Sequence, residues 1–309
     1  MTKKRRQPKS PMQKYTRKDF EREFPTDDAC LEWLKNYLYP DGIFCETCGR
    51  VTKHHKVVSR RSYSCDYCGH HVHPTADTIY HKSSTPMRLW FLAVYLMAST
   101  RCGISAKQLE RELGVTYKTA WRMFKQIRSM LSEDGGEPLA GKVEVDETYV
   151  GGKAKNMHAS KRTEKIQGRG AVGKVPVVGA VQRGGRVVAK TAEEVCADTL
   201  LPFIKEHVMP ESTIFTDELS SCGGVEGSGY ADKRVHHSAK VYVIGDAHTN
   251  TMEGFWSLVK RGIGGVYHNV GAKYLQSYFD EYSFRYNHRN DVMPMFRSFL
   301  SQVEKKSCD

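Results

Sequence analysis

The sequence predicts an α/β protein whose largest domain lies in the second half of the chain, behind two smaller modules. Three observations support this prediction. Two Cys-x-x-Cys pairs lie near the start, short helical patterns follow them, and β-type runs then alternate with helices. At 309 residues the chain is long enough for several modules with separate cores. We therefore expect a basic arm, two small modules, one α/β domain and a C-terminal tail.

Composition and charge narrow the range of partners. The net charge is +12, from 47 Lys and Arg against 35 Asp and Glu. This basic excess favours a polyanionic partner, most often nucleic acid, although an ordinary basic soluble protein is the alternative. The longest apolar run, 89–98, is too short to span a bilayer, and no apolar segment follows the basic N-terminus as in an export signal. We expect no membrane association and a reducing, cytoplasmic compartment.

Residues 1–40 combine a basic arm with a first helix. The first 18 residues hold eight Lys or Arg and no acidic residue, so the arm either contacts phosphates or only keeps the chain in solution. Apolar residues between positions 19 and 39 recur with helical spacing. We expect that helix to pack on the module that follows it.

Residues 41–73 carry the strongest local motif. Two Cys-x-x-Cys pairs are separated by 16 residues, a spacing typical of a four-cysteine zinc site. Four thiolates complete a tetrahedron, so this zinc would be structural. Nearby, His70, His71 and His73 could compete as ligands, but we expect them on the surface or facing DNA. The expected zinc-ribbon ligands are Cys45, Cys48, Cys65 and Cys68.

Residues 84–132 predict three helices, the last two arranged as a helix-turn-helix. Pro86 begins the first helix, and Ser105 is a suitable N-cap for the second. The glycine turn at 114–116 leads into a longer helix at 117–131. A plain helical bundle is the alternative, but beside a zinc site in a basic chain we favour DNA binding. The side chains expected to face DNA are Tyr117, Lys118, Arg122, Lys125 and Arg128.

Residues 138–290 follow a linker and alternate strands with helices, and residues 291–309 are expected to form a tail. The expected strands are 142–149, 175–182, 186–191, 213–217 and a possible one at 235–237. The other expected elements are a basic insertion at 151–174, helices at 198–208, from Asn250 and at 272–288, and a glycine turn at 262–265. Three strands, a helix and a further strand resemble a ribonuclease-H-like α/β sheet.

Two of these strands end in aspartates. Asp146 would stand on the first, central strand, and Asp217 would end the fourth strand beside it. On the later helix Asn250, Glu253 and Lys260 project from one face, while an apolar stripe faces the core. Carboxylates held a metal's width apart bind Mg²⁺ or Mn²⁺. Two such ions, roughly 3.5–4 Å apart, can assist both the attacking and the leaving oxygen in phosphoryl transfer.

The third metal-binding position has two candidates. Asn250 is a good N-cap, and Glu253 three residues later would complete a capping box with it. Glu253 also lies seven residues before Lys260, so that both share one helix face. We favour Glu253 as the ligand and Asn250 as a cap that could also touch metal or water.

These motifs resemble DDE-type insertion-sequence transposases of the zinc-ribbon group related to Merlin elements. The resemblance rests on residues 145–152, 215–217, 248–262 and 282–289, and on the order of ribbon, helix-turn-helix and catalytic domain. It implies an enzyme that cuts DNA at the inverted repeats of its element and joins the 3′ ends to target DNA with Mg²⁺ or Mn²⁺. It also implies Lys260 near the cut, self-association in the active complex and a nucleoid-associated location in a bacterial cytoplasm.

Two other functions remain as alternatives. The first is a DNA-binding regulator with an inactive ribonuclease-H-like domain, and the second is a nuclease without strand transfer. The presence of Asp146, Asp217 and Glu253 together argues against an inactive domain. The sequence separates the nuclease from the transposase only through the family resemblance.

Overall fold

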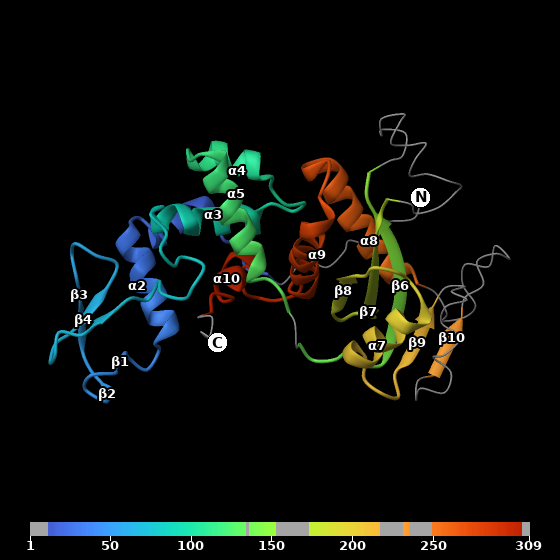
Figure 1. The fold of residues 1–309 in the computed structure, drawn as a ribbon, viewed down its shortest axis with the longest axis horizontal. Coiled ribbons are helices and arrows are strands. Elements are labelled where there is room, and N and C mark those ends of the chain that lie inside the picture. Colours follow the sequence, from blue (N-terminus) through green and yellow to red (C-terminus); the bar gives the residue numbers. More distant parts are fainter. Residues whose placement is uncertain (1–11, 134–135, 153–172, 217–230, 235–248, 305–309) are drawn as a thin grey trace, which may run out of the picture. The chain divides into compact units, whose positions relative to one another are not determined.

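The computed structural model describes residues 12–133, 136–152, 173–216, 231–234 and 249–304. The chain forms two compact units, whose elements are labelled in Figure 1. Unit 1 comprises Met1–Met130 with Arg289–Asp309, and unit 2 comprises Leu131–His288. No helix in the described part of the chain combines the length and the apolar character needed to cross a membrane.

The core of unit 1 is helical and uses both ends of the chain. Its helices are α1 (Arg17–Glu23), α2 (Asp27–Leu38), α3 (Met87–Ser99) and α10 (Met295–Leu300). A capping box between Thr16 and Asp19 begins α1. The ring of Phe296 on α10 lies 5.9 Å from that of Phe20 and 6.0 Å from that of Phe24. The segment expected as a tail therefore contributes a helix to this core.

The cysteine-rich segment of unit 1 consists of short antiparallel strands. One pair contains β1 (Phe44–Cys45) and β2 (Arg50–Val51), and a three-stranded sheet contains β3 (His54–Lys56), β4 (Tyr63–Cys65) and β5 (His71–Val72). Gly49 and Gly69 follow the two Cys-x-x-Cys pairs with φ of +64° and +72°. Because only glycine adopts this region without strain, the two knuckles form where the sequence predicted them.

The three helices expected from residue 86 onward are present. After α3 come α4 (Ala106–Leu113) and α5 (Tyr117–Ser129). The Ser105 side chain accepts a hydrogen bond from Gln108 N, and Gly114 ends α4 with a left-handed backbone. Thr116 then caps α5 through Thr119 N. The short helix, turn and longer helix are thus observed, while their use as a DNA-binding helix-turn-helix stays a prediction.

Unit 2 is built on a five-stranded mixed sheet with the order β10-β9-β6-β7-β8. The strands are β6 (Lys142–Val150), β7 (Val175–Gln182), β8 (Val187–Thr191), β9 (Thr213–Thr216) and β10 (Ala231–Arg234). The first three pair antiparallel, β9 runs parallel to β6, and β10 runs parallel to β9. This is the expected ribonuclease-H-like arrangement, with the Asp146 strand at its centre. The strand expected at 235–237, and most of the insertion at 151–174, lie outside the described residues.

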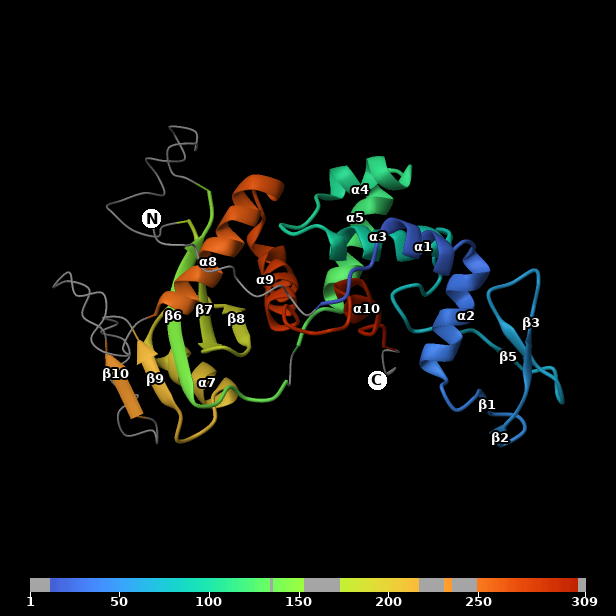
Figure 2. The same ribbon diagram turned by 180° about the vertical axis from the view of Figure 1, so that it is seen from behind.

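Each face of the sheet is covered by helices (Figures 1 and 2). On one face α7 (Ala197–His207) packs Leu200 and Ile204 against Val143 and Val145 of β6. On the other face lie α8 (Asn250–Gly262) and α9 (Ala272–Asn287), whose apolar side chains pack with Val177 of β7. Side chains alternate along a strand, so Glu144 and Asp146 point to the α8 face.

The turn expected at 262–265 is instead helical. α8 continues through Gly262 into a π-helical turn, Ile263–Tyr267, which ends at His268 with φ of +61°. A Cβ on Gly262 would lie 1.6 Å from the hydroxyl oxygen of Tyr282 on α9. This glycine is therefore needed for close helix packing and does not break the helix.

The outer edge of the sheet at β8 is closed by two amide side chains of α9. Gln276 accepts a hydrogen bond from Thr191 N at 2.7 Å and donates one to Ala189 O at 3.0 Å. Asn287 likewise bonds both the N–H and the carbonyl of Val187, at 2.7 and 3.1 Å. Because these groups are satisfied, the edge offers fewer bonds to another strand.

Candidate functional site

The four predicted zinc ligands converge in unit 1. The sulfurs of Cys45, Cys48, Cys65 and Cys68 all lie within 4.8 Å of one another. The sulfur–sulfur distance is 3.5 Å between Cys45 and Cys68, and 3.9 Å between Cys48 and Cys65. A tetrahedral zinc with bonds of about 2.3 Å requires sulfurs about 3.8 Å apart. The cluster therefore fits a structural zinc ion.

The surroundings of the cysteine sulfurs differ. A hydrogen bond with the hydroxyl of Thr52, at 3.2 Å, lowers the pKa of Cys65 to about 5. Hydrogen bonding to Cys68 is the main influence that raises the pKa of Cys48 to about 12. Neighbouring thiolates at this separation repel one another, so a cation is needed for all four to ionise together. Of the three nearby histidines, His71 belongs to β5, where its ring nitrogen lies 3.4 Å from the Ser62 hydroxyl.

The basic face predicted on α5 is present except at one position. Tyr117, Lys118, Arg122 and Lys125 are exposed. Arg122 also bonds the hydroxyl of Ser83 at 3.1 Å, within unit 1. These side chains leave one side of α5 polar and positively charged.

The expectation for Arg128 is wrong. Only 1% of this residue is exposed, and its guanidinium carbon lies 3.7 Å from the centroid of the Phe124 ring. Arg128 follows Phe124 by four residues, so it shares the helix face that also buries Ile127. Arg128 is therefore not part of the exposed basic face of α5 that was expected to contact DNA.

A cavity of about 520 Å³ in unit 2 brings together side chains that are far apart in the sequence. Asp146 of β6 lines it, together with Glu253 and Lys260 of α8. Ser257 and Arg261 of α8 also line it. The carboxylates that line the cavity, among them Asp146 and Glu253, provide hard oxygen ligands for Mg²⁺ or Mn²⁺, and the neighbouring cationic side chains suit phosphate. Glu147 and Thr148 of β6 also line this cavity.

The start of α8 is held by a buried carboxylate that sequence reasoning missed. Glu144, two residues before Asp146 on β6, is 0% exposed. It accepts hydrogen bonds from Thr251 N at 2.8 Å and Met252 N at 3.0 Å. It also accepts one from Arg183 Nε at 2.7 Å. A negative charge is favourable at a helix N-terminus, so the strand that carries Asp146 also fixes where α8 begins.

The expected capping box of Asn250 and Glu253 is therefore wrong. Asn250 is the first residue of α8 and is exposed, and Thr249 is the N-cap without a side-chain cap. Glu144 already satisfies the backbone donors that a local cap would bond. Asn250 is not among the described residues that line the cavity, whereas Glu253 is.

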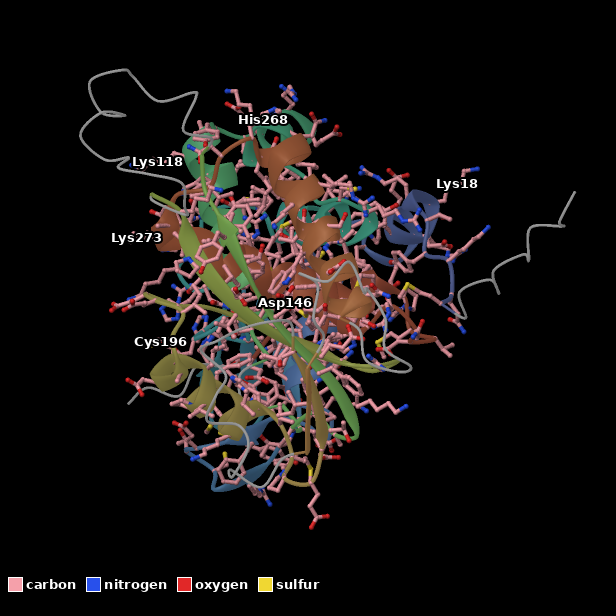
Figure 3. The ribbon with its side chains drawn as sticks, turned by 90° about the vertical axis from the view of Figure 1, so that its right-hand side faces the viewer. Lys18, Lys118, Asp146, Cys196, His268 and Lys273 are labelled. Carbon is pink, nitrogen blue, oxygen red and sulfur yellow. The ribbon has the colours of Figure 1, made fainter. Side chains whose placement is uncertain are left out.

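Trp256 connects the core stripe of α8 to the cavity. Its indole Nε1 donates a hydrogen bond of 3.0 Å to Asp146 Oδ2. Asp146, labelled in Figure 3, belongs to β6, the strand that α8 contacts. The alternating strand pattern and helix stripe predicted this packing, but nothing in the sequence indicated that the indole N–H reaches the aspartate.

Asp217 lies outside the described residues. The last described residue of β9, Thr216, pairs with Val145, which immediately precedes Asp146. Strand β9 thus runs toward the same end of the sheet as the Asp146 part of β6.

Comparison with known proteins identifies two domains in this chain. Residues 138–287 match the family model of the ISXO2-like transposase domain. Residues 25–71 match that of the transposase zinc-ribbon domain. The first match covers the sheet and the cavity of unit 2, and the second covers α2 and the four cysteines.

Individual proteins give matching results. A protein of Halobacterium salinarum, described as an uncharacterized protein in transposable element ISH50, is 29% identical over 77% of this chain and 83% of its own length. An uncharacterized transposase-like protein of Haemophilus influenzae is 27% identical over 40% of this chain and 96% of its own. Among solved structures, a pre-cleavage Mos1 transpososome covers 70% of this chain and 80% of its own at 12% identity, with a TM-score of 0.26, too low to support an argument.

Proposed function

Because the chain belongs to the DDE-type, zinc-ribbon transposases of insertion sequences, we propose that it cuts DNA at the ends of its own mobile element and joins the freed 3′ ends to target DNA. Self-association of the chain would bring two element ends together. Asp146, Asp217 and Glu253 are the catalytic carboxylates in this proposal, and Lys260 contacts DNA. The observation that carries it is the cavity in which Asp146, Glu253 and Lys260 meet.

The strand register supports the inclusion of Asp217. Thr216, the last described residue of β9, pairs with Val145, so β9 runs toward the end of the sheet where Asp146 lies. Asp146 and Glu253 already line one cavity, and the carboxylate of Asp217 would add a further hard ligand for the cations. Mg²⁺ or Mn²⁺ bound by these groups would supply Lewis-acid assistance to phosphoryl transfer.

The side chains of the cavity suit two successive displacements at phosphorus. In the first, water gives up a proton and attacks the phosphodiester at the element end, the bond from phosphorus to the 3′ oxygen breaks, and that oxygen takes up a proton and leaves as a hydroxyl. In the second, this 3′-hydroxyl gives up its proton and attacks a target phosphodiester, whose own 3′ oxygen takes up a proton and leaves. Both steps have the same in-line geometry, so one cavity can serve both. Lys260 and Arg261 provide positive charge beside the phosphates.

We infer that Glu253, and not Asn250, is the third catalytic residue. Glu253 lines the cavity with Asp146, and it lies on the same α8 face as Lys260. Asn250 begins the helix, is exposed, and is not among the described lining residues.

Recognition of the element ends is proposed for unit 1. The exposed side chains of α5 combine an aromatic ring with positive charges, and such a face suits phosphate and base contacts. In the full chain, Lys118→Ala should weaken binding to end DNA and reduce the slope of affinity against salt by about one phosphate contact. Arg128→Ala should instead lower stability, because that side chain is buried.

The decisive experiment is a strand-transfer assay with the full chain, element-end DNA and a target plasmid in the presence of Mg²⁺. Asp146→Asn and Glu253→Gln should abolish both cutting and joining while end binding persists. Asn250→Asp and Asn250→Ala should retain activity. Full activity of Glu253→Gln together with none in Asn250→Asp would reverse the assignment of the third ligand.

The same assay separates the alternative functions. Wild-type protein that cuts ends without joining them would be a nuclease. Protein that binds ends but neither cuts nor joins would act as a DNA-binding regulator.

A further inference from the structure

We propose that Trp256 is a positioning residue for the catalytic carboxylate of Asp146, fixing its orientation through the indole N–H. This inference rests on the proposed role of Asp146 as a metal ligand. In this inference the uncharged indole N–H of Trp256, on the core side of α8, fixes the direction in which the Asp146 carboxylate faces a divalent cation.

The first support is the geometry of the contact. The distance from Trp256 Nε1 to Asp146 Oδ2 is 3.0 Å, within the range of a good hydrogen bond. The two residues are 110 positions apart, so the bond forms only when α8 is docked on β6. The aspartate is half-buried and lines the cavity, whereas Trp256 is 4% exposed. The bond therefore joins the core to the edge of the cavity.

The second support is the rigidity of the donor. The Trp256 ring packs edge-on to Phe279 at 5.9 Å and lies 5.4 Å from Phe255. Beneath it, Gly179 of β7 is the strand partner of Asp146. A Cβ on Gly179 would lie 2.6 Å from the indole ring and 2.2 Å from Met252 Cε. The ring thus occupies space that exists because Gly179 has no side chain, and it has little freedom to turn.

The third support is the chemistry of the donor. An indole N–H donates one hydrogen bond, accepts none and carries no charge. A lysine or arginine in this place would also orient the carboxylate, but its charge would compete with a cation for the same oxygens. Trp256 can hold the plane of Asp146 and leave its full negative charge to attract the metal. Groups that orient a metal ligand in this way typically change metal affinity by about 10–100-fold when they are removed.

The test is a Mg²⁺ titration of the full-length protein without DNA, in wild type and in Trp256→Phe. Phenylalanine keeps most of the aromatic packing and removes only the N–H donor. We expect the dissociation constant for Mg²⁺ to rise by about 10–100-fold. Strand transfer by the variant should be weak at low Mg²⁺ and recover as the Mg²⁺ concentration is raised. An unchanged dissociation constant in a folded Trp256→Phe protein would overturn the inference.

Two controls separate positioning from packing. Leu275→Ala opens the same core cluster and does not replace Trp256, Phe255 or Phe279, so it should lower thermal stability and leave Mg²⁺ affinity unchanged. Trp90→Phe removes an indole N–H that donates to Ser83 Oγ in unit 1, and it too should leave Mg²⁺ affinity unchanged. If Leu275→Ala weakened Mg²⁺ binding as much as Trp256→Phe, the effect would be one of packing and the inference would fail.

Wild-type protein provides a measurement that does not depend on the variant folding. Of the four tryptophans, Trp256 is the only one between residues 131 and 288. A cation at Asp146 adds charge beside this indole, so Mg²⁺ should change the tryptophan fluorescence, and Asp146→Asn should remove the response. Absence of the response in wild-type protein that binds Mg²⁺ would overturn the inference.

The proposed function can fail separately. Wild-type protein that shows the Trp256-dependent Mg²⁺ affinity but no strand transfer would retain the positioning role and lose the transposition mechanism. Wild-type protein that transfers strands normally, with the same Mg²⁺ affinity in Trp256→Phe, would retain the mechanism and lose the positioning role.

Discussion

The four-cysteine cluster and the cavity around Asp146 are assembled in different ways. The cysteines come from two neighbouring knuckles, each followed by a glycine with positive φ, and Thr52 of the same segment bonds the Cys65 sulfur. The cavity needs β6 and α8, which are joined by hydrogen bonds between residues more than 100 positions apart. One site is made by a short segment, and the other by the packed core of a domain.

This difference predicts which site depends on metal for its shape. The cysteine segment has short strands of two or three residues and a small core, so an ion has to supply much of its cohesion. The shape of the cavity is set by the sheet and by the apolar side of α8, which pack together and bury many apolar side chains. Removing metal should unfold the first site and leave the framework of the second intact.

The largest expected effect is the loss of the ribbon when zinc is removed. Purified protein should contain about one zinc ion per chain, and Cys45→Ser combined with Cys65→Ser should abolish its binding. Structural zinc contributes about 10–16 kcal/mol in zinc-finger peptides at neutral pH, so residues 41–73 should lose their protection from hydrogen exchange. Protection in β6 and β7 should persist. Zinc-free wild-type protein, or a double variant that keeps its zinc, would contradict this view of the ribbon.

The next largest effect is expected when Glu144, which holds the start of α8 against β6, is replaced. Replacing it by Gln keeps its shape but removes the charge that pairs with Arg183 and faces the start of α8. Loss of one partner of a buried ion pair typically costs about 3–5 kcal/mol, which urea unfolding of the full chain would detect. Glu21→Gln is the matched control, because its pair with Arg17 is exposed and should contribute less than about 1 kcal/mol. If both variants lowered the free energy of unfolding by the same small amount, Glu144 would not hold the start of α8 in place.

Sequence reasoning recovered the parts of both sites that depend on local pattern. Cysteine spacing identified the four cysteines whose sulfurs converge, and strand and helix periodicity predicted that Asp146, Glu253 and Lys260 lie together, as they do in one cavity. It did not identify Glu144 as the cap of α8, because a capping group can come from anywhere in the fold, and a local candidate, Asn250, was available in the sequence.

The errors on α5 and after α8 have related causes. Arg128 was expected on the surface because it is charged, but a long side chain can bury its guanidinium on an aromatic ring such as that of Phe124. Gly262 was expected to begin a turn because glycine often ends helices. Here it is instead required for contact with Tyr282, a residue 20 positions later whose location only the tertiary fold determines.

A smaller loss of stability is expected when a side chain is added at Gly179, where α8 packs closely on β7. Gly179→Ala should destabilise the protein by about 1–3 kcal/mol, because its Cβ would overlap Met252 and Trp256. Gly254→Ala is the matched control. It lies on α8, and apart from its chain neighbours and its own helix backbone no atom of the described residues lies within 4 Å of the new Cβ, so the change should stabilise by about 0.5–1 kcal/mol. Thermal unfolding of the two variants measures both. Destabilisation of equal size would mean that space beneath α8 does not limit its docking.

The smallest effect concerns another long-range contact of unit 2, where Glu133 meets the end of α9. Its carboxylate bonds His288 Nε2 at 3.1 Å and also accepts from the Asn287 amide. Burial alone would raise the pKa of Glu133, but these hydrogen bonds and the nearby charge of Arg186 outweigh burial and lower it. A carboxyl with a lowered pKa in the folded state adds stability above its unfolded pKa, about 4.3, and loses it as the pH falls through the folded value.

Glu133→Gln measures this contribution, since glutamine keeps an acceptor oxygen and removes the charge. The urea midpoint of the variant should lie below that of wild type near pH 7, and the gap should close as the pH is lowered below the pKa of the folded carboxyl. Glu137→Gln is the control, because that side chain is exposed, and its midpoint should follow wild type at every pH. A gap for Glu133→Gln that stays constant down to about pH 3 would mean that lost hydrogen-bond geometry, and not charge, accounts for the difference. The stability contributed by the contact between Glu133 and His288 would then not depend on the charge of Glu133, just as the apolar packing under α8 does not depend on charge.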